Sequence, residues 1–507
     1  MRRINRIIAV ITTIICVVTS ISACADHGSV TDTTTASAEE QGRELDIVTV
    51  GETGEASPEP GETADAGFDD QQGEKPTWEK ALDEKSAERE NRRAKLEEIH
   101  NEINDIKLHI RSLAIDLNKY KVPFGDFALK LFKECRNNSK DEGDILLSPL
   151  SVFFALAMTA NGARENTLAQ IEEMLGMSVN DLNEFVSGWS DLTASVSETL
   201  EKKNMMYNFG APVQQKFGGL SVNTANSAWL KDDPGLHMNR DYLDLIQNVY
   251  AGELFTAAFD DSTIDDINVW IEENTNGMIK NMVTSIDDSA VLFLINTLLF
   301  EGKWVSTFSK DSVRNDTFTT AAGEKIDLPF MHGSASKYFE DSRSIGIKKD
   351  YAFYDYSFAA IMPNEGIGID EYLSDFGGNE LVNALFKNTY DDAYIELSMP
   401  KYSTECRVEM KDILAQMGMP DAFDSDTADL SGMGTYDRGK IYVQDVIHKT
   451  YIEVDEEGTK AGAATAMMAV SGGVPTKIIN VDLNRPFIYM IIDENAQIPL
   501  FIGAFEG

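Results

Sequence analysis

A regular spacing of apolar residues marks one segment of the chain between residues 96 and 117. Seven apolar side chains follow one another at intervals of three or four: Leu96, Ile99, Ile103, Ile106, Ile110, Leu113 and Leu117. Charged residues fill most positions between them, which is the pattern of a helix with one apolar seam. We therefore predict an amphipathic helix or short coiled coil over residues 81–119.

The seam leaves two interpretations open. Isoleucine at both seam positions favours coiled coils of more than two strands, which would make the chain a homo-oligomer through the 96–117 helix. Alternatively, the helix packs on the domain that follows it in the same chain. The spacing fits both interpretations equally well.

A second pattern, with a period of two, runs through residues 451–469. Tyr451 to Val454 is strand-like, and the segment that follows, TKAGAATA at residues 459–466, consists almost entirely of small residues. Side chains of a strand alternate between its two faces. With Thr459 inward, the outward face carries the only charge, Lys460, and the inward face carries Ala461, Ala463, Thr465, Met467 and Ala469. Such a strand fits between existing strands without a clash. Residues 441–446 (IYVQDV) also form a strand-like run.

The first 23 residues resemble an export signal. Three arginines among the first six residues precede an apolar run from Ile7 to Val18, which is short for a permanent membrane span. The run leads to ISAC at residues 21–24, which resembles the lipobox of bacterial lipoproteins. We predict a lipoprotein signal peptide over residues 1–23 and lipidation of Cys24. The protein would then be exported and lipid-anchored at the bacterial cell surface or envelope; a plain cleaved signal is the alternative.

The composition changes after the signal. Residues 24–80 are rich in Thr, Glu, Gly and Pro and poor in apolar side chains, which predicts an acidic disordered tether. The whole chain has 84 acidic and 44 basic side chains, a net charge of −40. This charge repels phosphate backbones and no basic stripe offsets it, so nucleic acid is not an expected partner.

The sequence contains no recognisable catalytic or metal-binding motif. Four cysteines are too few for a disulfide-rich scaffold or a Cys-cluster zinc site. The six histidines have no metal-ligand spacing, and no Gly-x-Ser-x-Gly elbow supplies a nucleophile. We therefore expect no catalytic residue, no metal, no cofactor and no enzymatic activity. Cys135 and Cys406 form a possible pair, but we expect both to be buried as small apolar side chains.

Fragments in a fixed order through the remaining chain resemble one family. They are LSPLSV at residues 147–152, ALAM at 155–158, NGA at 161–163, NTLLFEGKW at 296–304, LSMPK at 397–401, DVIHK at 445–449, EVDEEGT at 453–459, NRPFI at 484–488 and PLFIG at 499–503. On these motifs, residues 120–507 are identified as a domain that resembles the serpins, the serine protease inhibitor family.

The resemblance implies an α+β serpin fold with a large central β-sheet, two smaller sheets, about nine helices and an exposed reactive-centre loop. It also implies suicide-type inhibition, in which a target serine protease cleaves the loop and forms an acyl-enzyme. The freed loop inserts into the central sheet as a new strand and traps the protease in a covalent complex. The alternative is a non-inhibitory serpin used as a surface-displayed binding or adhesion lipoprotein.

The resemblance further assigns roles to single residues. It places Ser148, Ser151, Asn296 and His448 in the family's shutter cluster beneath the sheet and Trp304 in the breach, where insertion begins. Lys401 and Glu456 match a hinge ion pair. The full set of expected hinge residues is Glu456, Glu457, Gly458, Thr459, Ala461, Ala463, Ala464 and Thr465.

The reactive bond is expected near Gly472 and Gly473, from the family's spacing after Glu456. The candidates are Val470, Ser471, Gly472 and Gly473. Val470 and Ser471 suit the shallow pocket of an elastase-like or subtilisin-like protease. No Arg or Lys lies between Met467 and Thr476, which argues against trypsin-like targets, whereas Met467 or Met468 would admit chymotrypsin-like enzymes.

Overall fold

The computed structural model describes residues 77–138, 143–209, 220–287, 289–387, 393–459 and 477–507. These residues form ten α-helices and eighteen strands, and the strands belong to four sheets. The expected signal peptide, Cys24 and most of the acidic tether lie outside the described residues.

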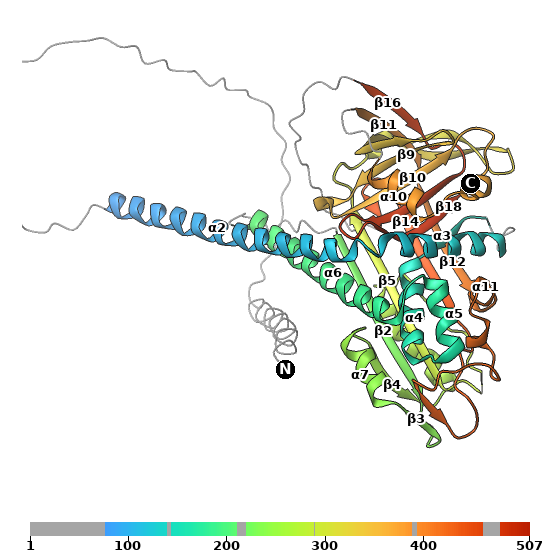
Figure 1. The fold of residues 1–507 in the computed structure, drawn as a ribbon. Coiled ribbons are helices and arrows are strands. Elements are labelled where there is room, and N and C mark those ends of the chain that lie inside the picture. Colours follow the sequence, from blue (N-terminus) through green and yellow to red (C-terminus); the bar gives the residue numbers. More distant parts are fainter. Residues whose placement is uncertain (1–76, 139–142, 210–219, 288, 388–392, 460–476) are drawn as a thin grey trace, which may run out of the picture. The chain divides into compact units, whose positions relative to one another are not determined.

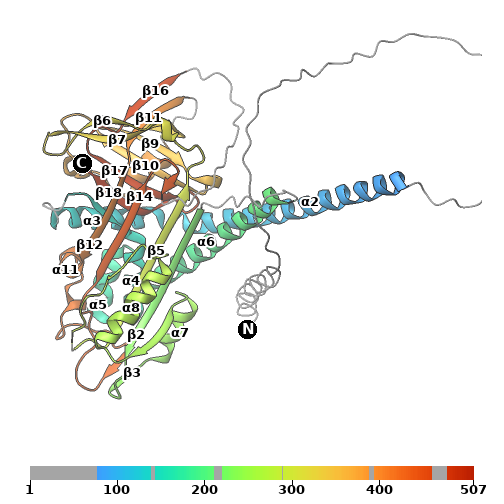
Figure 2. The same ribbon diagram turned by 180° about the vertical axis from the view of Figure 1, so that it is seen from behind.

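The central sheet has six strands in the order β12-β14-β15-β5-β2-β4. They are β12 (Tyr402–Glu409), β14 (Ile447–Val454), β15 (Gly458–Thr459), β5 (Leu292–Lys303), β2 (Leu220–Lys231) and β4 (Glu253–Ala257). The two longest strands, β2 and β5, pair in antiparallel fashion along nearly their whole length. Figure 2 shows these strands running side by side through the molecule.

A second six-stranded sheet has the order β1-β18-β17-β10-β9-β8. Its strands are β1 (Ile145–Leu147), β18 (Ile498–Phe505), β17 (Phe487–Asp493), β10 (Tyr356–Pro363), β9 (Ser344–Asp350) and β8 (Lys337–Glu340). Every residue of β10, β17 and β18 is buried. These strands are covered on both faces, which explains their nearly continuous apolar sequences.

The remaining strands form a four-stranded sheet and a two-stranded pair. The four-stranded sheet contains, in order, β16 (Ile478–Asp482), β11 (Tyr394–Pro400), β7 (Lys325–Ala335) and β6 (Arg314–Thr319). The pair consists of β3 (Leu236–Met238) and β13 (Gly434–Tyr436). The mixed α+β architecture agrees with the expected fold, although the second sheet has as many strands as the central one.

Helix α4 lies between the two large sheets, against β5 on one side and β18 on the other. The helix begins after Ser148, whose Oγ accepts a hydrogen bond from Ser151 N, with Pro149 in the first turn. Both features favour a helix start at this residue. The helices are α2 (Thr77–Leu117), α3 (Lys121–Asn138), α4 (Pro149–Gly162), α5 (Glu165–Leu175), α6 (Val179–Asn208), α7 (Arg240–Asn248), α8 (Asp261–Asn274), α9 (Ile369–Leu373), α10 (Gly378–Phe386) and α11 (Lys411–Met417).

Helix α8 covers the opposite face of the central sheet (Figure 2). Ile267 and Ile271 of this helix pack with Trp229 of β2 and Ile295 of β5 in a separate apolar cluster. The segment that follows α8 contributes Met282 and Val283 to the same cluster. The central sheet is therefore buried on both faces, by α4 on one side and by α8 on the other.

The helix predicted from the apolar seam is α2, and its seam packs on α6 (Figure 1). Ile99, Ile103, Ile110 and Leu117 are only 3–5% exposed, whereas Ile115, which lies off the seam, is 74% exposed. The two helices run antiparallel, because Lys202 Nζ contacts Glu102 Oε2 at 2.7 Å and Lys119 Nζ contacts Glu184 Oε1 at 2.9 Å. This arrangement corresponds to the second interpretation, a helix packed on its own domain.

Two smaller expectations can be compared with the structure. Residues 441–446 form no strand, because β14 begins at Ile447, where its pairing with β12 begins at Glu409. Cys135 is buried as expected, whereas Cys406 is only half-buried. In the described part of the chain, no helix is long and apolar enough to cross a membrane.

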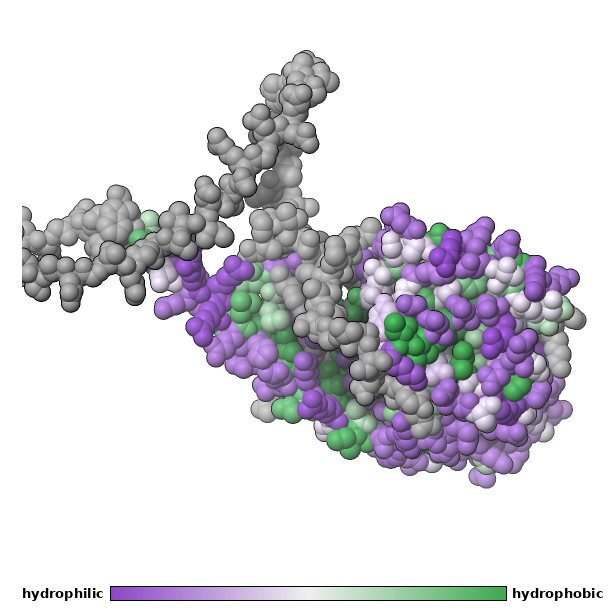
Figure 3. Space-filling view, turned by 90° about the horizontal axis from the view of Figure 1, so that it is seen from above, coloured by the Kyte–Doolittle hydropathy of each residue, from purple (hydrophilic) through white to green (hydrophobic). Residues whose placement is uncertain are grey.

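The face of the molecule in Figure 3 is mostly hydrophilic, and its hydrophobic side chains lie in small groups. Large apolar side chains that are strongly exposed include Leu108, Ile115, Tyr394 and Ile478. Single exposed apolar residues are common on soluble proteins and need no functional explanation.

Candidate functional site

The central sheet contains a gap between two of its strands. Strand β15 lies between β14 and β5 but is only two residues long, and it pairs Gly458 with Lys303, Thr459 with Gly302, and Thr459 with Val454. Among the described residues, no strand pairs with the facing edges of β5 before Gly302 or of β14 before Val454. We call the space between these two edges the strand slot. Its backbone groups are available to an additional strand.

The chain enters the slot through a tight turn at residues 455–457, which we call the hinge turn. The Asp455 carboxylate accepts hydrogen bonds from Glu457 N at 2.8 Å and Gly458 N at 3.0 Å. The next position requires glycine, because a Cβ atom on Gly458 would lie 2.1 Å from the carbonyl oxygen of Gly302. The hinge turn and Gly458 together let the backbone reverse direction and pair with β5.

Two ion pairs hold the hinge turn from outside. Lys401 Nζ lies 2.8 Å from Glu456 Oε2, and Lys310 Nζ lies 3.1 Å from Glu457 Oε1. Burial tends to raise the pKa of Glu456, but the hydrogen bond from Lys401, a backbone hydrogen bond and the charges of Lys401 and Lys310 together lower it below its usual value. The same hydrogen bond raises the pKa of Lys401. Both groups are therefore charged at neutral pH, and the structure brings together the two residues expected to form the hinge ion pair.

Trp304 anchors the hinge turn from the end of β5. Its backbone N–H donates to Glu457 O at 3.0 Å and its indole Nε1 donates to Asp455 O at 2.9 Å. The indole stacks on Tyr351, with ring centroids 4.5 Å apart and an interplanar angle of 14°. The Tyr351 hydroxyl in turn contacts the hydroxyl of Thr459, which is 2% exposed. Thr459 therefore faces inward, as the period-two pattern predicted.

A polar cluster lies beneath the slot, at the start of α4. Ser148 N donates to His448 Nε2 at 2.9 Å, and Ser148 Oγ donates to Leu500 O at 3.0 Å. Ser151 Oγ donates to the backbone oxygen of Asn296 at 3.4 Å. Burial lowers the pKa of His448 to about 4, so the ring is neutral at physiological pH. The structure thus places the four expected shutter residues in one cluster that joins β5, β14 and α4.

One member of this cluster has an unused hydrogen-bonding group. Asn296 Nδ2 donates to Asn226 Oδ1 at 2.8 Å, but among the described atoms Asn296 Oδ1 is buried without a hydrogen-bond partner. An unsatisfied buried acceptor costs about 1–3 kcal/mol. A donor that entered the slot beside Asn296 would remove this penalty.

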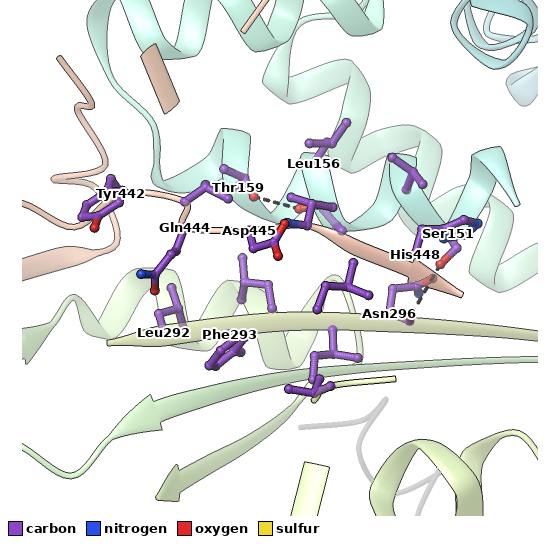
Figure 4. A pocket seen from close by; sticks show the side chains of 18 of the residues that line it. Ser151, Leu156, Thr159, Leu292, Phe293, Asn296, Tyr442, Gln444, Asp445 and His448 are labelled. Carbon is purple, nitrogen blue, oxygen red and sulfur yellow. Dashed lines mark hydrogen bonds between the residues drawn. The ribbon is translucent and has the colours of Figure 1, made fainter. Parts of the chain in front are cut away.

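An apolar cavity of about 90 Å³ adjoins the polar cluster. Figure 4 shows it between α4 and the strands on both sides of the slot, with Asn296 and His448 at one end and Tyr442 and Gln444 at the other. Leu156 of α4, Leu294 of β5 and Val446 contribute to the apolar part of its lining. The cavity therefore lies where the inward side chains of an inserted strand would point.

Sequence reasoning missed three residues of the site. Tyr351 and Asn226 contact expected site residues, and Thr450 of β14 donates from its Oγ1 to Leu146 O at 2.8 Å beneath the slot. Thr450 is two residues after His448, so the period-two pattern of β14 could have identified it. Asn226 lies on β2 and Tyr351 directly after β9, and neither segment has a local sequence signal for the site.

Several expected site residues lie outside the described residues. They are the hinge positions Ala461, Ala463, Ala464 and Thr465 and the reactive-bond candidates Val470, Ser471, Gly472 and Gly473. Among the described side chains, no group of three or more His, Cys, Asp or Glu residues is placed to hold a metal ion.

Comparisons with known proteins agree with this architecture. The family model described as Serpin (serine protease inhibitor) matches residues 124–506. Serpin B7 of Homo sapiens is 28% identical over 393 residues, which cover 75% of this chain and 96% of that protein. An uncharacterized serpin-like protein of Thermococcus kodakarensis is 28% identical over 385 residues, which cover 74% of this chain and 83% of that protein.

Solved structures of serpins are also similar to this chain. The native state of tengpin, a thermophilic serpin, is 37% identical with a TM-score of 0.66, and the match covers 77% of this chain and 94% of tengpin. Thyroxine-binding globulin in complex with thyroxine shares the fold at 19% identity, with a TM-score of 0.61 and coverage of 77% and 99%.

The chain therefore belongs to the serpin family, and its family is one of serine protease inhibitors rather than catalysts. The complex of thyroxine-binding globulin with thyroxine shows that a protein of the same fold can bind a small molecule.

Proposed function

We propose that this serpin is a suicide-type inhibitor of serine proteases that traps its target by inserting the cleaved loop into the strand slot. The observation that carries the proposal is the seating of β15 at one end of the slot, with Thr459 facing inward. A cleaved loop that continues from Thr459 along the same path needs no change of register to become the missing strand.

Continuing the register of β15 gives a specific position to each inserted residue. Because β15 is antiparallel to both neighbours, each step of two residues along the loop moves two residues back along β5 and β14. From the pairs Thr459 with Gly302 and Thr459 with Val454, Thr465 would lie between Asn296 and His448. Its hydroxyl would then be beside the unpaired Asn296 Oδ1.

The same register brings Met467 between Leu294 and Val446, which line the apolar cavity. Ala461 and Ala463 would lie beside Phe300 and Leu298, whose side chains are already buried, so that small residues there need the least displacement. The inward residues of the loop therefore complement the slot in both size and polarity.

Val470 to Gly473 remain the proposed region of the reactive bond, with elastase-like or subtilisin-like proteases as the proposed targets. The experiment mixes the full-length protein with pancreatic elastase, and separately with subtilisin, and separates the products on a denaturing gel. A band at the summed mass that survives SDS is the expected result. Cleavage without this band for every protease, chymotrypsin included, would contradict the proposal and favour the non-inhibitory binding lipoprotein.

A matched pair of variants tests the insertion step itself. Thr465→Glu would bury a carboxylate between β5 and β14, so we expect cleavage without the stable complex. Lys460→Glu introduces the same side chain on the outward face, and we expect the complex to persist. Equal behaviour of the two variants would contradict the proposed register.

We also propose that Cys24 carries the lipid anchor and that the protein is exported. The support is the basic and apolar pattern of residues 1–23 followed by the lipobox-like ISAC sequence. In bacteria that express the chain, Cys24→Ser should move it from the membrane fraction to the soluble fraction. Membrane association that is unchanged by this substitution would contradict the anchor.

A further inference from the structure

A lysine is buried directly behind the breach, and nothing in the proposed insertion step uses it. Lys349 belongs to β9 of the second sheet and is 2% exposed. Its Nζ donates to Ser306 O and to Ser334 O, both at 2.7 Å. Nζ also lies 4.2 Å from the ring centroid of Phe308 and 5.5 Å from that of Trp304. Two carbonyl oxygens and two aromatic faces thus surround it, and no carboxylate among the described residues forms an ion pair with it.

The two carbonyl oxygens belong to different parts of the fold. Ser334 lies on β7 of the four-stranded sheet, whereas Ser306 lies in the segment of residues 304–309 that joins β5 to β6. We call this segment the β5–β6 connection. Lys349 therefore ties the second sheet, the four-stranded sheet and the end of the central sheet together at one point.

The β5–β6 connection also supplies donors to the hinge turn. Trp304 N donates to Glu457 O, Phe308 N donates to Glu456 O at 2.9 Å, and the Trp304 indole donates to Asp455 O. Each carbonyl oxygen of the hinge turn is thus held by this connection. The backbone oxygen of Asp350 accepts from Val305 N at 3.0 Å, so β9 fixes the connection at two successive residues, Val305 and Ser306.

We propose that Lys349 is a positioning residue for loop insertion, because it fixes the β5–β6 connection that holds the hinge turn closed. This inference rests on the proposed inhibitory function. Removal of the amine takes away the donor that Ser306 O and Ser334 O share, and the connection is then free to shift away from the hinge turn.

The stability of the hydrogen bonds from Lys349 to Ser306 O and Ser334 O depends on the charge of the amine. Burial lowers the pKa of Lys349 to about 7, and Asp350 opposes the shift. A neutral amine keeps two N–H groups, which match the two carbonyl acceptors. If opening of the connection admits water, the pKa returns toward its usual value of about 10.5 and a proton is taken up. Between these two pKa values the closed form therefore gains stability as the pH rises.

Other titratable side chains also lie near the hinge turn. They are Asp350, the pairs Lys310 with Glu457 and Lys401 with Glu456, and His332 of β7, whose Nε2 lies 3.0 Å from Asp316 Oδ2. The difference between the wild-type protein and a Lys349 variant isolates the contribution of Lys349, because these groups are common to both proteins.

The test measures hydrogen exchange of the Trp304 and Phe308 backbone amides, which bond to the hinge turn, in the full-length protein. We expect Lys349→Met to lower their protection at least tenfold at pH 8.5. In the wild-type protein, protection corrected for intrinsic exchange should rise by up to roughly 20-fold from pH 6.5 to 8.5, and this rise should be absent in Lys349→Met. Lys349→Gln keeps N–H donors without titrating, so it should recover part of the protection but not the pH dependence.

Lys348→Met is the matched control. Lys348 is the neighbouring buried lysine, but it pairs with Glu494 and faces away from the β5–β6 connection. We expect this substitution to leave the two amides protected even where it lowers overall stability. Unchanged protection in Lys349→Met, or an equal loss in Lys348→Met, would overturn the inference. The exchange measurement needs no protease, so absence of a covalent complex would contradict the proposed function without affecting this result.

Discussion

The α2–α6 interface and the strand slot differ in how far a partner element covers them. The apolar seam of α2 needs a partner, and it packs on α6 of the same domain, where each of its residues is buried or half-buried. The facing edges of β5 and β14 also need a partner, but β15 supplies only two residues of one. One region is covered by a helix of the same domain, whereas in the other no further strand of the described residues pairs with the two edges. The proposed activity depends on the strand slot.

The largest effect is expected at the α2–α6 interface. Ile103→Ala deletes a side chain that is 4% exposed in the α2–α6 seam, and such substitutions cost about 2–5 kcal/mol. Hydrogen exchange reports local opening as well as global unfolding, so the loss should appear as at least ~30-fold lower protection of amides along the seam. Ile115→Ala, on the exposed face of α2, should change nothing. Protection that depends on protein concentration would instead support a coiled coil between chains.

A smaller effect is expected at the slot, through the pH dependence of stability. Burial holds the pKa of His448 at about 4 in the native protein, compared with 6.5 in the unfolded chain. Between these values the unfolded chain binds a proton that the native state does not. Stability is therefore lost as the pH falls from 6.5 to 4, by up to about 3 kcal/mol.

The comparison for this prediction is His448→Asn, which keeps an acceptor near Ser148 but does not titrate. Urea denaturation at pH 6.5 and pH 4 should show a larger loss of stability for the wild-type protein than for the variant. Other titrating groups cancel in this difference. Equal losses would show that His448 is not buried as a neutral ring.

The smallest effect is expected from the charges at the edge of the α2–α6 interface. Lys202 and Glu102 form a partly exposed ion pair at 2.7 Å. Ion pairs that are exposed to solvent contribute little to stability, and salt weakens them. Lys202→Met should therefore lower the exchange protection of α2 only slightly in low salt, and the difference from wild type should vanish in high salt. A loss as large as that of Ile103→Ala would show that charge, rather than the apolar seam, holds the helix.

The sequence predicted the α2 helix well because the information is local. Seven apolar residues at helical spacing lie within 22 residues, and the structure buries or half-buries all of them. The choice of partner was not local, because a seam of isoleucine and leucine packs equally well on a second copy or on α6. Only the tertiary structure shows that α6 takes this place.

Part of the site was also predictable, because some of its information is local in the sequence. The alternation around Thr459 identified its inward face, and the family's motifs identified Trp304, Lys401, Glu456 and the shutter residues. Asn226, Tyr351 and Lys349 contact residues that lie between 15 and 108 positions away in the chain. Their residue types suggest ordinary core or surface positions. A lysine in a strand gives no sign in the sequence that it is buried against two carbonyl oxygens.

The two residues of β15 have a kinetic consequence. A strand that adds to a sheet must first bring one of its ends into place, and this step costs entropy before most of the new hydrogen bonds form. Gly458 and Thr459 already occupy the first two positions beside β5. Insertion after cleavage would therefore begin from a preformed nucleus and proceed by elongation alone. Inhibition would then require that β5 and β14 separate, and the loop insert between them, faster than the protease hydrolyses the acyl-enzyme.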